Sequence, residues 1–294
     1  MRINRAARGG LVWLSRDLDE GRGQMRDRIG LISGATSGVG GAIVAERLAH
    51  GDSVIAVGRS VERLADLRDA TPASVGTGKL LTLSADLSTR EGQTLLRSAI
   101  EASAPDGLDY LVHAAFGHIG EDEGKSIADI TQEELVEFLS NSVILAHLTV
   151  QTCLPSLLRK RGSQLVFIVA DWGLPQHNVL LYGESEGGAV GSEPYVSAKY
   201  ALTGLASALE IQQDVRVTAV YPGVIASAAL DTAGEPTFLT LDATDDEVAA
   251  AGYSVPEAAI PLSDIVAAVS FALSTRATVK TISIRPTGRG YIGV

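Results

Sequence analysis

The chain has 294 residues, 46% of them hydrophobic, which is enough for a large buried core in one α/β domain. Its formal net charge of −11 argues against nucleic acid as a partner, because nucleic-acid binding depends on clustered cations. No apolar run approaches the roughly 18 residues of a membrane span. The single cysteine, Cys153, excludes a disulfide within the chain and fits a reducing compartment. We therefore expect a cytoplasmic protein.

Residues 1–24 are expected to form a disordered extension. The segment is rich in arginine, and its apolar patch over residues 11–14 is too short for the hydrophobic region of a secretory signal. Met25 opens the stretch MRDRIGLISGATSG, which is typical of the start of a domain. We expect a single domain over residues 25–294.

Short apolar runs alternate with longer helical patterns from residue 28 onward. Most of the runs are apolar throughout, as expected of parallel strands that are covered on both faces. The alternation predicts an α/β fold, with a Rossmann-like, doubly wound parallel sheet of about seven strands in a three-layer α/β/α arrangement. The expected strands are 29–33, 53–57, 80–84, 109–113, 164–169, 215–220 and 281–285, and the expected helices include 38–50, 88–102, 131–159 and 262–274.

Three local patterns refine this plan. Thr131 and Glu134 form a capping-box pattern at the start of the longest expected helix. Residues 174–194 and 224–261 are long segments without a clear helical or strand pattern, and each follows the end of a strand. Because ligands bind beyond the carboxyl ends of the strands in such sheets, we interpret both segments as lids, with the main lid region at about 224–261.

The stretch SGATSGVGGA follows the first expected strand and opens the first expected helix. Gly34 allows a tight turn, Gly38 lets the backbone approach a pyrophosphate, and Gly40 lets the helix pack closely. The free amides at the helix N-terminus attract phosphate oxygens. The position of this loop predicts a dinucleotide site.

The end of the second strand favours NADP(H) as the dinucleotide. A carboxylate at this place would accept the ribose hydroxyls of NAD, but this chain has Arg59 and Ser60, which suit a 2′-phosphate. Asp86, after the third strand, is placed either to accept from the adenine amino group or to cap the next helix.

Tyr195 and Lys199 are four residues apart in PYVSAKYAL and would share one face of a helix. A free phenol titrates at about 10, and a cation a few ångströms away lowers that pKa by roughly one to three units. Such a pair suits a general acid/base near neutral pH.

These motifs, in this order, resemble the short-chain dehydrogenase/reductase family over residues 28 to 290 or so. The matching elements are Gly34, Gly38, Gly40, Asp86, Asn141, Tyr195, Lys199 and the stretch YPGVIAS at 221–227. The resemblance implies interconversion of alcohols and carbonyls with NAD(H) or NADP(H). It also implies a homo-dimer or homo-tetramer through the helices 131–159 and 195–212.

The resemblance further implies individual roles. Tyr195 would be the acid/base, Lys199 would also hold the nicotinamide ribose, and Asn141 would hold a water that links the lysine to solvent. The candidate cofactor-binding residues are Gly34, Thr36, Ser37, Gly38, Val39, Gly40, Arg59, Ser60, Asp86, Leu87, Ala115, Tyr195, Lys199, Pro222, Gly223, Ile225 and Ser227. No metal is expected.

The chain departs from the family pattern in three places. After the fourth strand it has HAAFG, so Phe116 stands where a glycine normally lies beside the cofactor, and His113 is expected to be a satisfied strand-end residue. The family's catalytic serine falls on Ala170, which has no hydroxyl. Tyr195 follows Ala170 by 25 residues, where the family has about half that spacing.

Several groups could replace the missing donor. Tyr182, Ser185 or Ser192 could fold back from the inserted segment, and Asp171 could hydrogen-bond the substrate or act as a base. Asp171 could equally cap a turn.

Three functions remain open from the sequence. The first is an NADPH-dependent carbonyl reductase or alcohol dehydrogenase that acts on a small or medium lipophilic substrate. The second is an NADP-retaining lyase, dehydratase, cyclase or epimerase that uses Asp171, as in the extended branch of the family. The third is a non-catalytic member that binds a dinucleotide.

Overall fold

The computed structural model describes residues 28–71, 78–117, 128–171, 193–212, 214–223, 225, 229–230, 236–237 and 260–285. The predicted extension over residues 1–24 lies outside the described residues. So do most of the segment 174–194 and most of the predicted lid region 224–261. The lid interpretations therefore stay predictions.

The core is one parallel sheet of seven strands in the order β3-β2-β1-β4-β5-β6-β9. The order reverses between β1 and β4, which lie side by side, and this confirms the predicted doubly wound α/β fold. The seven expected strands are all present, with ends that shift by at most two residues. Their bounds are β1 Ile29–Ser33, β2 Ser53–Gly58, β3 Leu80–Ser84, β4 Tyr110–His113, β5 Gln164–Ile168, β6 Arg216–Pro222 and β9 Thr281–Ile284.

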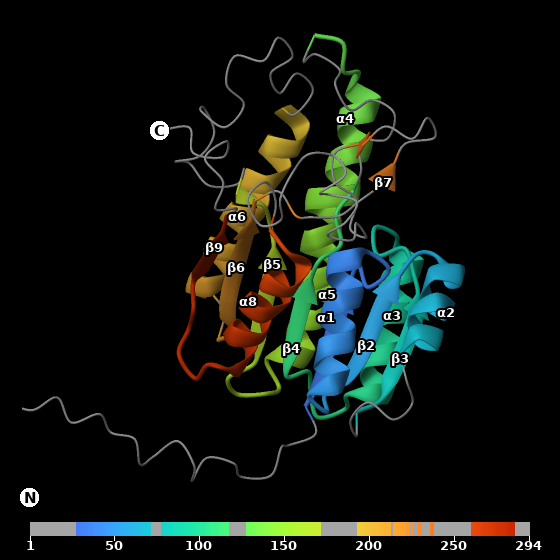
Figure 1. Ribbon diagram of the computed structural model, residues 1–294, viewed down its shortest axis with the longest axis vertical. Coiled ribbons are helices and arrows are strands. Elements are labelled where there is room, and N and C mark those ends of the chain that lie inside the picture. Colours follow the sequence, from blue (N-terminus) through green and yellow to red (C-terminus); the bar gives the residue numbers. More distant parts are fainter. Residues whose placement is uncertain are drawn as a thin grey trace, which may run out of the picture.

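Two helical layers cover the sheet (Figure 1). Successive strand residues point to opposite faces, so Leu31 packs into one apolar cluster and Ile32 into the other. The first layer holds α3 (Arg90–Ser103), α5 (Leu145–Leu157) and α6 (Glu193–Gln212), and the second holds α1 (Gly38–Ala49), α2 (Val61–Ala70) and α8 (Leu262–Ser274). The five central strands are mostly buried because both of their faces are covered, whereas the edge strands β3 and β9 are half-buried or exposed.

The helix expected over 131–159 is interrupted. It consists of α4 (Gln132–Leu139), a π turn over Ser140–Ile144 and α5. The capping box at its start is confirmed, because Thr131 Oγ1 accepts from the Glu134 amide at 3.2 Å and Glu134 accepts from the Thr131 amide at 2.9 Å. The π turn was not predicted, and it contains Asn141. Within the predicted lid region, β7 (Ala229–Leu230) and β8 (Pro236–Thr237) form a short antiparallel pair that was also not predicted.

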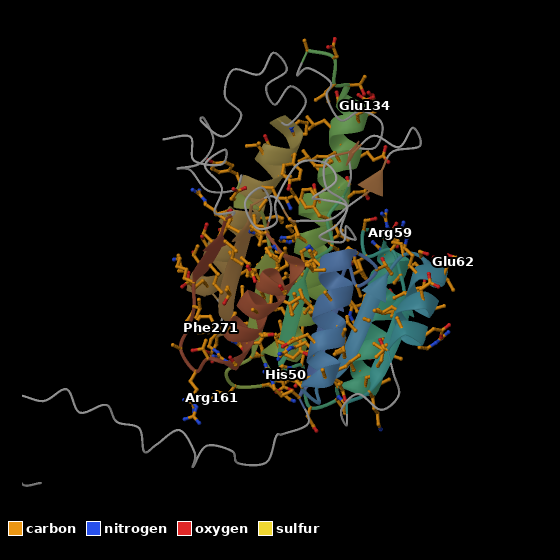
Figure 2. All side chains as sticks on the ribbon, in the orientation of Figure 1. His50, Arg59, Glu62, Glu134, Arg161 and Phe271 are labelled. Atoms are coloured by element: carbon orange, nitrogen blue, oxygen red, sulfur yellow. The ribbon has the colours of Figure 1, made fainter. Side chains whose placement is uncertain are left out.

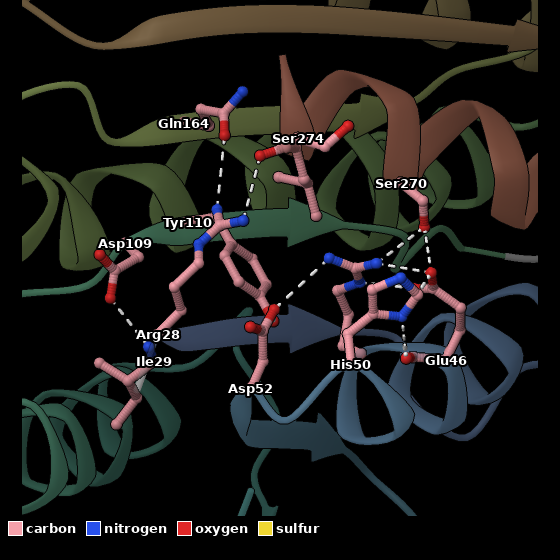
Figure 3. A network of polar contacts seen from close by, with 12 residues as sticks. Arg28, Ile29, Glu46, His50, Asp52, Asp109, Tyr110, Gln164, Ser270 and Ser274 are labelled. Atoms are coloured by element: carbon pink, nitrogen blue, oxygen red, sulfur yellow. Dashed lines mark hydrogen bonds and ion pairs between the residues drawn. The ribbon is translucent and has the colours of Figure 1, made fainter. Parts of the chain in front are cut away.

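A buried polar network joins the sheet to α1 and α8 at the amino ends of the strands (Figure 3). Asp52, just before β2, accepts from the Tyr110 hydroxyl at 3.0 Å and pairs with Arg47 of α1 at 3.5 Å. Arg47 also donates to Glu46 and to Ser270 of α8. Burial, reinforced by Asp52, raises the pKa of Tyr110, so its phenol stays a donor.

We expect Asp52→Ala to lower the free energy of unfolding by about 2–4 kcal/mol, because Arg47 and the Tyr110 hydroxyl would lose a shared buried partner. Urea unfolding followed by circular dichroism measures the change. The control is Asp69→Ala, which removes an exposed carboxylate at the end of α2 and should leave the midpoint unchanged. Equal midpoints for both variants would contradict a stabilising role for the network.

Candidate active site

A cavity of about 440 Å³ opens at the carboxyl ends of the strands, where the strand order reverses. Fourteen of the predicted site residues line it: Gly34, Thr36, Ser37, Val39, Arg59, Asp86, Leu87, Ala115, Asn141, Tyr195, Lys199, Pro222, Gly223 and Ile225. Gly38, Gly40, Ser60 and Asp171 are described but do not line it, and Ser227 lies outside the described residues. The cavity therefore brings together most of the predicted cofactor site with the Tyr195–Lys199 pair.

The turn between β1 and α1 depends on two glycines. Gly34 has φ of 72°, and a Cβ there would lie 2.6 Å from the Ala115 amide nitrogen. A Cβ on Gly40 would meet the Gly34 carbonyl, so Gly40 serves the packing of the turn and not the cavity wall. Ser37 caps α1 by accepting from the Gly40 amide at 3.2 Å. The N-terminus of α1 thus opens on the cavity, as a pyrophosphate site requires.

Two arginines reach the cavity after β2. Arg59 follows the strand, and Arg63 is one helical turn further along α2 (Figure 2 labels Arg59 at the end of the sheet). The sequence analysis missed Arg63, although an arginine in the first turn of the helix that follows Arg59 was a usable signal. Ser60 instead caps α2, because its hydroxyl accepts from the Arg63 amide at 3.1 Å and donates to Glu62 at 2.9 Å.

Asp86 serves a turn and lines the cavity at the same time. Its carboxylate accepts from the amide and the hydroxyl of Ser88 at 2.9 and 2.6 Å, while Thr89 caps α3. Asp86 therefore does not cap α3, because Thr89 is the cap residue. Asp86 lines the cavity, and its contact with adenine stays a prediction.

The loop after β4 packs directly against the π turn. A Cβ on Gly117 would lie 2.7 Å from Cβ of Asn141, so the two segments approach as closely as a glycine allows. Both residues line the cavity. A π turn inside a helix is frequent at functional sites, and here it lies at the wall of the cavity.

Tyr195 and Lys199 lie at the start of α6, on the cavity side. The Lys199 ammonium is 5.1 Å from the centre of the Tyr195 ring. Lys199 is only 4% exposed, and this burial lowers its pKa to about 7. The pair therefore has the geometry predicted from its spacing, and the lysine titrates in the physiological range.

His113 is buried at the end of β4, but it is only partly satisfied, which differs from the expectation. Its Nδ1 shares a hydrogen bond of 2.9 Å with the Ser33 hydroxyl, whereas its buried Nε2 has no hydrogen-bond partner among the described residues. Burial first, and then the positive charge of Lys199, lower its pKa to about 3. A ring that stays neutral at ordinary pH is not a proton donor for catalysis there.

Ala170 lines the cavity after β5, so this position of the wall carries a methyl group and no hydroxyl. Its neighbour Asp171 is 1% exposed and is not among the residues that line the cavity. Tyr182, Ser185 and Ser192 lie outside the described residues.

The described residues lack a membrane-spanning helix and a cluster of metal-binding side chains. No helix in that part of the chain is long and apolar enough to cross a membrane. No group of three or more His, Cys, Asp or Glu in the same residues could hold a metal ion.

A doubly wound sheet, a glycine turn at a helix N-terminus and a buried lysine beside a tyrosine define a nicotinamide-dependent oxidoreductase. The pattern of the short chain dehydrogenase family matches residues 28–237, and the chain belongs to this family.

Three relatives illustrate the similarity. The human dehydrogenase/reductase SDR family member 11 is 26% identical over 91% of this chain and 97% of its own length. The uncharacterized oxidoreductase YusZ of Bacillus subtilis is 28% identical over 64% of this chain, and the match spans only 60% of its length. The structure of an alcohol dehydrogenase from Thermococcus sibiricus, complexed with 5-hydroxy-NADP, has a TM-score of 0.67 at 20% identity and covers 88% of this chain and 97% of that one.

We expect Lys199→Met to stabilise the fold at pH 7 by roughly 2–4 kcal/mol, because it removes a buried charge. The folded pKa of about 7 is below the unfolded value of 10.5, so the unfolded chain binds more protons between these values. The stability of the wild type should therefore rise with pH in this window, and its deficit relative to the variant should shrink.

Urea unfolding at pH 7 and pH 9.5 measures this difference. The matched control is Lys79→Met, which replaces an exposed lysine before β3 and should show no such pH-dependent gap. A constant gap between wild type and Lys199→Met at both pH values would contradict the lowered pKa.

Proposed function

We propose that the chain is an NADPH-dependent carbonyl reductase or alcohol dehydrogenase for a small or medium lipophilic substrate, with Tyr195 as the acid/base. The observation that carries this proposal is the Tyr195–Lys199 pair on the wall of a cavity that also contains the glycine turn. When bound, the nicotinamide supplies or accepts a hydride.

The residues present fit an NADP-type dinucleotide. Gly34 lets the turn after β1 lie against the Ala115 backbone, and the N-terminus of α1 opens on the cavity beside this turn. Arg59 and Arg63 place two guanidinium groups on the cavity of an otherwise acidic chain. These two arginines would hold the 2′-phosphate, because a guanidinium fork matches phosphate oxygens. The Thermococcus sibiricus structure, solved with 5-hydroxy-NADP, is consistent with this preference.

The chain's own chemistry is proton transfer and positioning. The phenol of Tyr195 would donate its proton to the substrate oxygen as a carbonyl becomes an alcohol, and accept it in the reverse direction. The charged form of Lys199 stabilises the phenolate that remains, and it would also hold the nicotinamide ribose. Asn141, which also lines the cavity, would hold a water that reconnects the lysine to solvent.

Ala170 is expected to lower the rate of carbonyl reduction. A methyl group on the cavity wall cannot donate to the substrate oxygen. Loss of one such donor commonly costs about 10²–10³ in rate, so we propose slow turnover on simple carbonyls. The Asp171-dependent alternative gains no support, because that carboxylate is buried away from the cavity wall.

The first test concerns cofactor choice. We expect Arg59→Ala with Arg63→Ala to raise the Kd for NADPH by about 10–100-fold, because charge-assisted hydrogen bonds to the 2′-phosphate are lost. The Kd for NADH should stay nearly constant. Isothermal titration calorimetry measures both, with Arg68→Ala on the exposed side of α2 as the control. Equal losses for the two dinucleotides would refute 2′-phosphate recognition.

The second test concerns the proton. We expect Tyr195→Phe to lower kcat by about 10²–10⁴-fold with little change in the Kd for NADPH, because the ring stays and only the transferable proton is lost. The absorbance of reduced nicotinamide, followed over a panel of lipophilic aldehydes and ketones, measures turnover. Tyr200→Phe on the same helix is the control. Persistent turnover by Tyr195→Phe would remove the tyrosine from the chemistry.

We also propose that the chain forms a homo-dimer or homo-tetramer through α4, α5 and α6. Exposed apolar side chains on these elements support the proposal: Leu135, Val136, Ile144 and Ile211 are 37–80% exposed. Covering them between subunits would remove apolar surface from water.

A further inference from the structure

Phe116, in the loop after β4, stands where the family pattern has a glycine. Its ring centre is 3.5 Å from the Lys199 ammonium, so the charge lies close to the aromatic ring. The same ring meets Tyr195 in an edge-to-face contact, with centroids 5.3 Å apart and planes at 71°. Phe116 therefore contacts both members of the catalytic pair, and it lines the cavity.

A third aromatic contact fixes the ring from α4. Phe138 is 3% exposed and meets Phe116 edge-to-face, at 5.8 Å and 75°. Aromatic pairs in this arrangement prefer defined orientations, because the ring edge is positive and the face is negative. Phe138 thus restricts where the Phe116 ring can turn, and the ring presents a defined surface to Lys199.

The buried Lys199 ammonium requires a contact that compensates for the loss of water. Among the described residues, the Lys199 ammonium contacts two rings, those of Phe116 and Tyr195. Burying a charge without compensation is costly, and a ring face within about 6 Å attracts a cation. A ring favours the charged ammonium but carries no net negative charge. A carboxylate in the same place would raise the pKa of the neighbouring phenol.

Among the described residues, two titratable groups other than Lys199 lie near this contact. Tyr195 lies on the same helix as Lys199, and His113, at the end of β4, is close enough to feel the lysine charge. His113 stays neutral at ordinary pH, and Asp171 after β5 is buried off the cavity wall. A change in Lys199 protonation on altering Phe116 would therefore report mainly on the ring.

We propose that Phe116 is a positioning residue of this active site, whose ring binds the charged form of Lys199 and holds it beside Tyr195. The role of the pair in catalysis rests on the proposed function, whereas the ring–ammonium contact does not. Burial lowers the pKa of Lys199 to about 7, and the ring opposes that effect.

The experiment measures the protonation of Lys199 in the full chain without cofactor. The rate at which a small amine-reactive reagent modifies Lys199 is followed against pH by peptide mass spectrometry. For Phe116→Leu, which keeps an apolar side chain but removes the ring, we expect the apparent pKa to fall by roughly 0.5–1.5 units. Phe116→Tyr keeps the ring and should restore the wild-type value. An unchanged or raised pKa in Phe116→Leu would overturn the proposal, because the ring would then only exclude water.

A second series covers the case in which Phe116→Leu does not fold. Phenylalanines with one, two and three ring fluorines at position 116 change the volume little but weaken the negative face of the ring. The pKa of Lys199 should fall stepwise with fluorination, and a flat series would overturn the proposal.

The outcomes also separate this inference from the proposed function. A fluorine-dependent pKa in a protein that reduces no carbonyl would keep the ring contact and reject the reductase. A protein that reduces carbonyls, but whose Lys199 pKa does not change with fluorination, would support the reductase and reject the ring contact. Where turnover is found, the pH at which kcat reaches half its maximum should move with the Lys199 pKa across the same series.

Discussion

The parallel pairing of β1 with β4 is the constraint on which the site depends. Because the strand order reverses there, the chain leaves these two neighbouring strands toward opposite helical layers, and the space between the departing loops cannot be closed by either layer. Gly34 and Gly117 then let the loops approach their neighbours at backbone distance. The strand order thus creates the cavity, and the side chains on the bordering loops determine its chemistry.

The cavity edge of the sheet combines a buried lysine with apolar neighbours. Lys199 is almost fully buried, and Ala170 on the cavity wall has no hydroxyl. Phe116 and Tyr195 place two aromatic rings beside the Lys199 ammonium. Aromatic contacts are therefore the main feature of the lysine's described surroundings.

Sequence reasoning predicted the framework well because the relevant signals are local. Apolar runs with β-branched residues specified every strand of the sheet, and Thr131 with Glu134 specified a helix start to the residue. It failed where a contact joins distant segments. The π turn at Asn141 leaves no periodic signature in the sequence. The sequence showed that Phe116 was unusual, but only the structure shows that its ring meets Lys199. The sequence did not reveal that Ser60 caps α2, because a short hydroxyl side chain suits a helix cap and a phosphate ligand equally well; its contact with a 2′-phosphate stays a prediction.

The polar network around Asp52 lies at the amino edge of the sheet, and the cavity lies at the carboxyl edge. A strand of five residues separates the two edges by about 16 Å, which is beyond the range over which substitutions usually couple. The contacts that stabilise the fold and the residues of the candidate site thus lie at opposite ends of the same strands. Changes that widen or reshape the substrate space can accumulate at one end while the other keeps the fold intact, which makes this architecture well suited to divergence of substrate range.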